Sequence, residues 1–218
     1  CHGAGRQHGL RRRVAGVSSV RIEDIASHAS FRRLASIAGI AIDLRYAGSN
    51  NFDGRVLYQG IDCAWLRVEA ARGLETAAAW LAAHHPNQRL LVLDALRPQR
   101  VQEAIWRDVQ GTPAQIYFAD PARGSIHSFG MAVDVTLLDE KHRELDMGSG
   151  FDEMSLRSHP ALEADQLAAG HIAQPHIQAR EVLRAAMHHG GFRGIPTEWW
   201  HFNHGDAARV RLTLPRVE

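Results

Sequence analysis

Two short segments of this 218-residue chain concentrate side chains that can bind a metal ion and move protons. The first segment holds His127 and Asp134, and the second holds Glu198 and His201. Both segments are otherwise strongly apolar, since valines flank Asp134 and two tryptophans separate Glu198 from His201. A buried carboxylate or imidazole without a partner costs several kcal/mol. A shared metal ion would give all four side chains a partner at once.

These residue types suit hydrolysis with a zinc ion. Catalytic zinc takes three protein ligands from His, Asp or Glu and keeps one coordination position for water. Zinc lowers the pKa of that water to about 7, and a carboxylate that is not a ligand must then move its proton to the leaving group. We therefore predict one Zn²⁺ per chain, with His127, Asp134 and His201 as ligands and Glu198 as the general base and acid.

The spacing of Glu198 and His201 is a difficulty for this hypothesis. Residues three apart on an ideal strand point to opposite faces of the sheet. A bulge or a sharp twist must bring both side chains to the site, or Glu198 must reach it from the side. Each motif alone also has an ordinary structural explanation, because a lone Asp in a strand usually marks a turn or a satisfied hydrogen bond.

The periodicity of the apolar residues predicts the elements that position these motifs. Residues 131–138 alternate as a strand, with Ala132, Asp134 and Thr136 on one face. Further strands are predicted at residues 40–45, 89–94, 198–203 and 209–214, the last at a sheet edge. Helices are predicted at residues 64–84, 99–109 and 178–188, with a short helix near 160–169. We expect an α+β fold: a single domain with a small, mostly antiparallel sheet, helices packed on it, and the zinc site at the sheet.

Composition and charge narrow the class of protein. Apolar residues make up 45% and charged residues 22%, which is typical of one globular domain of this length. The formal net charge of +1 gives no electrostatic case for a nucleic-acid partner. We find no apolar run long enough for a membrane span, and two distant cysteines indicate neither a disulfide framework nor a zinc site.

The first residues differ in character from the rest of the chain. Residues 1–13 are rich in Gly, His and Arg, and we expect a disordered basic tail over residues 1–20, with the domain spanning 21–218. No signal segment is visible in this chain, so the sequence leaves a cytoplasmic or periplasmic location open. The oligomeric state is open as well.

Several segments occur in an order that matches a known family. They are residues 42–47 (IDLRYA) with 50–52 (NNF), residues 94–98 (DALRP), residues 125–134 (SIHSFGMAVD), residues 147–152 (MGSGFD) with Ser158-His159, and residues 198–201 (EWWH). This ordered set resembles the D-alanyl-D-alanine dipeptidases, a branch of the zinc D,D-peptidases of cell-wall metabolism. The resemblance implies D-Ala-D-Ala as the small-molecule substrate. It also implies the same zinc ligands and the same role for Glu198.

The resemblance adds three residues to the site. Arg97 matches the family arginine that stabilises negative charge developing on the scissile carbonyl oxygen. The alternative is a purely structural role, in which Arg97 forms an ion pair with Asp94 on the surface. Asp152 matches an acid near the free ammonium of the substrate, although a loop-capping Asp would look the same in the sequence. Ser125 is expected to hydrogen-bond the substrate.

The chain also departs from the family pattern. Phe129 stands where the family often has Arg, and Ala95-Leu96 stands where it often has Gly-Tyr. Neither position is a zinc ligand, but both could reshape the pocket. A D,D-carboxypeptidase or a peptidoglycan endopeptidase with the same zinc site therefore stays open, as does a non-catalytic zinc-binding module.

Overall fold

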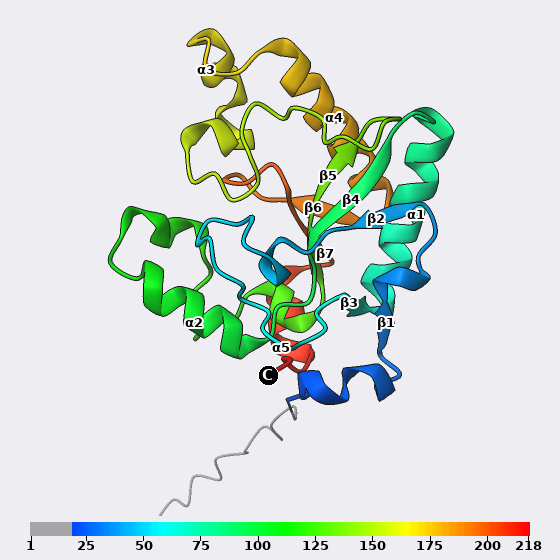
Figure 1. Cartoon of the computed structure of the whole chain (residues 1–218), viewed down its shortest axis with the longest axis vertical. Helices are drawn as coiled ribbons and strands as arrows, with labels where there is room; N and C mark the ends of the chain where they lie inside the picture. The colour runs from blue at the N-terminus through cyan, green and yellow to red at the C-terminus, as the bar shows by residue number, and fades with distance from the viewer. Residues whose placement is uncertain (1–18) are drawn as a thin grey trace, which may run out of the picture.

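A mixed sheet of five strands runs through the centre of the protein in the order β2-β4-β5-β7-β6 (Figure 1). The computed structural model describes residues 19–218. The strands are β2 Ile40–Ile42, β4 Arg89–Asp94, β5 Ala132–Leu138, β6 Phe192–Gly194 and β7 His201–His204. Strands β2 and β4 are parallel, and the other neighbouring pairs are antiparallel. The predicted α+β fold with a small, mostly antiparallel sheet is confirmed.

The helices cover the two sides of this sheet. They are α1 Val68–His84, α2 Gln99–Val109, α3 Glu163–Ala168, α4 Gln174–His189 and α5 Ala207–Thr213. Short 3₁₀ turns are η1 Ile22–Ser27, η2 Leu34–Ser36, η3 Arg45–Ala47, η4 Pro113–Tyr117, η5 Ile126–Phe129, η6 Leu156–Ser158 and η7 Pro160–Leu162. Helix α2 lies well away from α1 and α4 in Figure 1. Helices α1 and α4 pack together on one sheet face, where Val133 and Val135 of β5 join Leu74 and Leu183 in the main core. The other face of β5 carries Asp134.

The start of α1 differs from its prediction. The predicted helix at 64–84 begins at Val68, because β3, Trp65–Arg67, pairs antiparallel with β1, Phe31–Arg33. All three residues of β3 are buried. In an apolar run this short, periodicity cannot distinguish a buried strand from the first turn of a helix. The prediction from sequence therefore joined β3 and α1 into one helix.

The predicted edge strand at 209–214 is wrong, because this segment belongs to helix α5. The Asp206 side chain accepts a hydrogen bond from the backbone N–H of Arg209 at 2.7 Å and so caps the helix. Val210 is the buried residue of α5, and an apolar residue four positions later, Leu214, fits a helix as well as a strand. The Asp206 cap and the two alanines that follow it, Ala207 and Ala208, favour the helix.

Other boundaries shift by a few residues. Helix α4 begins at Gln174 rather than 178, with Pro175 in its first turn, and the predicted strand at 198–203 begins only at His201. Strand β6 was not predicted at all, since three residues are too few for a periodic pattern.

The predicted tail at 1–20 lies outside the described residues as far as position 18, so the domain boundary stays a prediction. Val20 itself is buried and bridges Val217 near the C-terminus. Among residues 19–218, no helix is both long enough and apolar enough to cross a lipid bilayer.

Helices α1 and α4 approach each other at two glycines. A Cβ on Gly73 would lie 2.4 Å from the carbonyl oxygen of Gly190 and 2.8 Å from the His204 ring. We expect Gly73→Ala to lower the free energy of unfolding by about 1–3 kcal/mol, because the clash outweighs the helix propensity gained. Urea unfolding would measure this. Gly150→Ala is the control, since its Cβ would meet nothing within 4 Å; equal stability of both variants would contradict the packing argument.

Candidate active site

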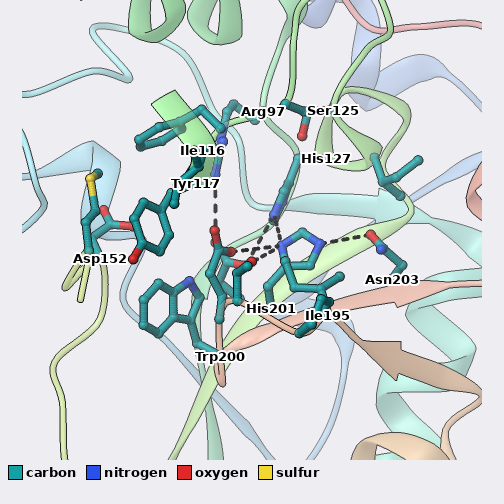
Figure 2. A pocket seen from close by; sticks show the side chains of 18 of the residues that line it. Arg97, Ile116, Tyr117, Ser125, His127, Asp152, Ile195, Trp200, His201 and Asn203 are labelled. Carbon is teal, nitrogen blue, oxygen red and sulfur yellow. Dashed lines mark hydrogen bonds and ion pairs between the residues drawn. The ribbon is translucent and has the colours of Figure 1, made fainter. Parts of the chain in front are cut away.

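Three side chains that could hold a metal ion, those of His127, Asp134 and His201, meet on the sheet face away from α1 and α4, and Figure 2 shows the two histidines of this group. Asp134 of β5 and His201 of β7 are direct partners in the antiparallel register, and His127 comes from η5 just before β5. Asp134 Oδ1 lies 3.0 Å from His201 Nδ1, and His127 Nε2 lies 3.2 Å from His201 Nδ1 and 3.3 Å from Asp134 Oδ1. The structure thus brings together all three side chains predicted to be metal ligands.

Hydrogen bonds on the far side of each imidazole set its tautomer. His127 Nδ1 lies 2.7 Å from the carbonyl oxygen of Ala95, which can only accept, so Nδ1 carries the proton and Nε2 presents a lone pair. His201 Nε2 lies 2.9 Å from Asn203 Oδ1, which leaves the Nδ1 lone pair toward Asp134. Two nitrogen lone pairs and a carboxylate oxygen therefore face one another.

This arrangement fits a metal ion. Atoms bound at 2.0–2.2 Å in a tetrahedron around zinc lie roughly 3.3–3.5 Å apart, close to the separations found here. Three lone pairs directed at one point repel each other unless a cation lies between them. Without a metal ion, protons on the imidazoles would have to take its place: burial raises the pKa of Asp134, but positive charge and hydrogen bonds from His127 and His201 would outweigh burial and hold that pKa below its ordinary value.

Glu198 reaches the same place from outside the strand. It lies in the loop before β7, so the requirement that residues three apart face opposite ways does not apply. Its Oε2 lies 3.9 Å from His201 Nδ1, and the side chain lines the same cavity. Burial raises the pKa of Glu198 to about 8, the negative charges of Asp134 and Asp152 add to this, and His201 and Arg97 oppose it.

Arg97 is buried and firmly held. Its Nε and Nη2 donate to Asp94 Oδ2 at 3.1 and 2.7 Å, and its Nη1 donates to Gln102 Oε1 at 3.0 Å. Asp94 also accepts a 2.5 Å hydrogen bond from Tyr58. The ion pair with Asp94 does form, but in the interior rather than on the surface, and Arg97 Nη2 lies only 3.7 Å from Asp134 Oδ2.

Asp152 and Ser125 line the same cavity, which has a volume of about 250 Å³, and Figure 2 shows them well apart, with Ser125 on the side of His127. Asp152 has a φ of 58° and lies 3.4 Å from both the Tyr46 hydroxyl and the Phe52 N–H. Burial, then the charge of Asp134, raises the pKa of Asp152 to about 7. All seven predicted site residues therefore border one cavity.

Sequence reasoning missed the residues that orient the ligands. Asn203 had a usable signal, because residues two apart on a strand share a face and it follows His201 by two. Asp94 was considered only as a surface partner of Arg97, and Tyr46, whose hydroxyl lies 3.4 Å from Asp152, received no role although it stood inside a recognised segment. The Ala95 carbonyl had no signal, since any residue supplies one.

Comparison with known proteins agrees with this geometry. Residues 28–217 match the family described as D-ala-D-ala dipeptidase, Peptidase M15. The chain belongs to this family of metallopeptidases. It is 39% identical to a D-alanyl-D-alanine dipeptidase of Escherichia coli K12, over 79% of this chain and 83% of that protein. It is 35% identical to a D-alanyl-D-alanine dipeptidase of Synechocystis, over 68% and 72%.

This family membership confirms the predicted resemblance to the D-alanyl-D-alanine dipeptidases and the predicted enzyme class, a metallopeptidase. A solved structure of the LdcB LD-carboxypeptidase covers 85% of this chain and 72% of its own, at 16% identity and a TM-score of 0.46. That likeness is too distant to bear on function.

The raised pKa of Asp152 has a consequence for stability. A carboxyl group that titrates near 7 in the folded chain and near 3.8 when unfolded binds its proton more tightly when folded, so stability is lost as the pH rises from about 4 to 7. In metal-free protein, Asp152→Asn should therefore raise the free energy of unfolding at pH 8 by on the order of 2 kcal/mol. Asn also tolerates the positive φ.

Urea unfolding at pH 8 and pH 5 would measure the effect, which should shrink at the lower pH. Asp53→Asn is a suitable control, because Asp53 makes its ion pair with Arg55 instead of lining the cavity. A gain in Asp152→Asn that is the same at both pH values would contradict the electrostatic cause.

Proposed function

We propose that this chain hydrolyses D-Ala-D-Ala to two D-alanines with one Zn²⁺ held by His127, Asp134 and His201. The observation that carries the metal proposal is the convergence of two imidazole nitrogens and one carboxylate oxygen. The Ala95 carbonyl and Asn203 set the tautomers of the two imidazoles so that their lone pairs face this point. The substrate is supported by the relatives' names and by a cavity of about 250 Å³, which suits a dipeptide better than a long peptide.

Glu198 is the proposed proton carrier. When bound, zinc supplies a Lewis acid that acidifies water and polarises a carbonyl group. Glu198 takes a proton from the attacking water and gives it to the amine that departs. The positive charge of a zinc ion held by His127, Asp134 and His201 would lower the pKa of Glu198 from about 8 toward about 7, where a general base is most effective.

Arg97 is the proposed stabiliser of negative charge on the carbonyl oxygen. A guanidinium that is already fixed by Asp94 and Gln102 needs no reorganisation when that charge develops. Its central carbon also lies 4.9 Å from the centre of the Tyr46 ring, which limits its movement further. Asp152 pairs with the substrate ammonium, and Ser125 donates a hydrogen bond to the substrate.

The deciding experiment measures release of D-alanine from D-Ala-D-Ala and from its N-acetylated form. We expect zinc-loaded protein to cleave only the free dipeptide, because the acylated form has no ammonium to pair with Asp152. Chelator-treated protein should cleave neither, because it lacks the metal. Cleavage of the acylated form would point instead to a D,D-carboxypeptidase. Stoichiometric zinc with no cleavage of either would favour a binding module.

Replacing Glu198 by Gln should separate metal binding from proton transfer. We expect kcat to fall about 10²–10⁴-fold, because loss of a general acid–base group removes that much rate, while the zinc content stays at one per chain. Metal analysis and a D-alanine release assay would measure the two effects. Glu140→Gln, at an exposed position, is the control for loss of charge. Near-normal turnover in Glu198→Gln would disprove the role.

Replacing Asn203 by Ala should weaken zinc binding. His201 would lose the partner that directs its Nδ1 lone pair, and such partners are worth about 10–100-fold in metal affinity. Competition with a chromophoric chelator would measure the dissociation constant. Asn203→Asp keeps an oxygen acceptor and should stay close to the parent; an unchanged affinity in Asn203→Ala would show that Asn203 does not orient the ligand.

A further inference from the structure

Three arginines gather at one end of the cavity without a carboxylate to neutralise them. Arg123 and Arg211 line the cavity, and Arg216 lies beside them. Within residues 19–218, no carboxylate oxygen comes within 4.0 Å of any of the three guanidinium groups. Residues 1–18 contain neither Asp nor Glu. The chain itself therefore supplies no counter-charge for this arginine cluster.

Two members of the cluster are held in place by neutral groups. Arg211 Nε donates to the carbonyl oxygen of Gly124 at 2.9 Å. Arg216 donates to the carbonyls of Pro121 and Ala122 at 3.1 and 3.2 Å. Backbone carbonyls fix the direction of a guanidinium but leave its full charge in place.

The like charges affect each other. Burial, followed by the positive charges of Arg123 and Arg216, lowers the pKa of Arg211. Cations held together in this way gain most from an anion that sits between them, and guanidiniums bind carboxylates with paired, directional hydrogen bonds. The cluster thus has the charge and the donors of a carboxylate-binding subsite.

Its position gives the subsite a role. The hydrogen bond to Gly124 fixes Arg211 next to Ser125, two residues before His127. The Ser125 hydroxyl makes no hydrogen bond within the described part of the chain, so it is available to a ligand. Asp152 borders the same cavity but lies well apart from Ser125 (Figure 2). The cavity therefore has a carboxylate and the arginines at separate places, which matches the two charged ends of a free dipeptide.

We propose that Arg123 and Arg211, together with the Ser125 hydroxyl, bind the C-terminal carboxylate of the dipeptide. This inference rests on the proposed function and deepens it. With the ammonium at Asp152 and the carboxylate at the arginines, the central amide lies across the metal-binding side chains. The site then selects for a free α-carboxylate, and it disfavours C-terminal amides and peptides extended at that end.

Binding without turnover tests the proposal directly. Zinc-loaded Glu198→Gln protein is titrated calorimetrically with D-Ala-D-Ala and with D-alanyl-D-alaninamide. We expect the acid to bind at least 10-fold more tightly than the amide, which corresponds to about 1.4 kcal/mol. Adding Arg123→Gln should reduce this preference several-fold and leave amide binding unchanged. Arg123 is exposed, and no hydrogen bond of its guanidinium is found among residues 19–218, so its loss should not disturb the fold.

Two further variants separate charge from structure. Arg211→Lys keeps the charge and should retain part of the preference, whereas Arg211→Gln should lose it. Arg209→Gln is the matched control, because Arg209 is an exposed arginine of the same helix α5 that does not line the cavity. It should bind both ligands like the parent.

The outcomes distinguish this inference from the function on which it rests. Equal affinity for acid and amide in the parent, with D-Ala-D-Ala still cleaved by the Glu198-containing enzyme, would overturn the carboxylate subsite alone. A preference that survives both Arg123→Gln and Arg211→Gln would overturn the assignment to these arginines. Failure of the zinc-loaded protein to bind or cleave either ligand would overturn the proposed function and the inference together.

Discussion

The mutual repulsion of three lone pairs is the constraint on which the site depends. His127, Asp134 and His201 direct acceptor atoms at one point from three different segments, at separations of 3.0–3.3 Å. Such an arrangement is unfavourable in a protein interior unless a cation compensates for it. The surrounding structure maintains it through the Ala95 carbonyl and Asn203, which hold the protons of both imidazoles on the outer side. The sheet, the 3₁₀ turn before β5 and the loop before β7 position these groups.

Buried charge around this point is handled by pairing rather than by exposure. Asp94 lies between Arg97 and the hydroxyl of Tyr58, so a carboxylate that is fully buried still has three donors from two side chains. Arg97 in turn lies near Asp134. Removing one member would leave the others charged and unpaired, which generally costs more than the pair contributes. The region next to the three candidate metal ligands is therefore held by several charged hydrogen bonds at once.

The sequence predicted the chemistry of the site better than the elements that build it. His127, Asp134, Glu198 and His201 were found because polar residues of these types are conspicuous among apolar neighbours. Strand β4 and helix α2 were predicted at their observed bounds because each has one clear period and clear end signals. The edge strand at 209–214 was wrong because a cap outside the segment decides its structure.

The features that could not be predicted from the sequence are tertiary contacts. No pattern along the chain indicates that Arg123 and Arg211, far apart in the sequence, border one cavity. Nor does it indicate that Ala95 orients His127, because every residue carries a carbonyl. The position of Glu198 could be stated only as a difficulty, since whether a residue lies in a strand or just before it depends on where β7 starts to pair.

The register between β5 and β7 also restricts how the length of this chain can change. Asp134 faces His201 across an antiparallel pair, and side chains alternate between the two faces with a period of two. One residue inserted between His127 and Asp134 would turn the carboxylate toward helices α1 and α4. The long stretch between β5 and β6 contributes Asp152 to the cavity but none of the three candidate metal ligands. Helix α3 lies beyond Asp152 in this stretch, so additions around α3 would give the chain new surface and leave both Asp152 and the three ligands in place.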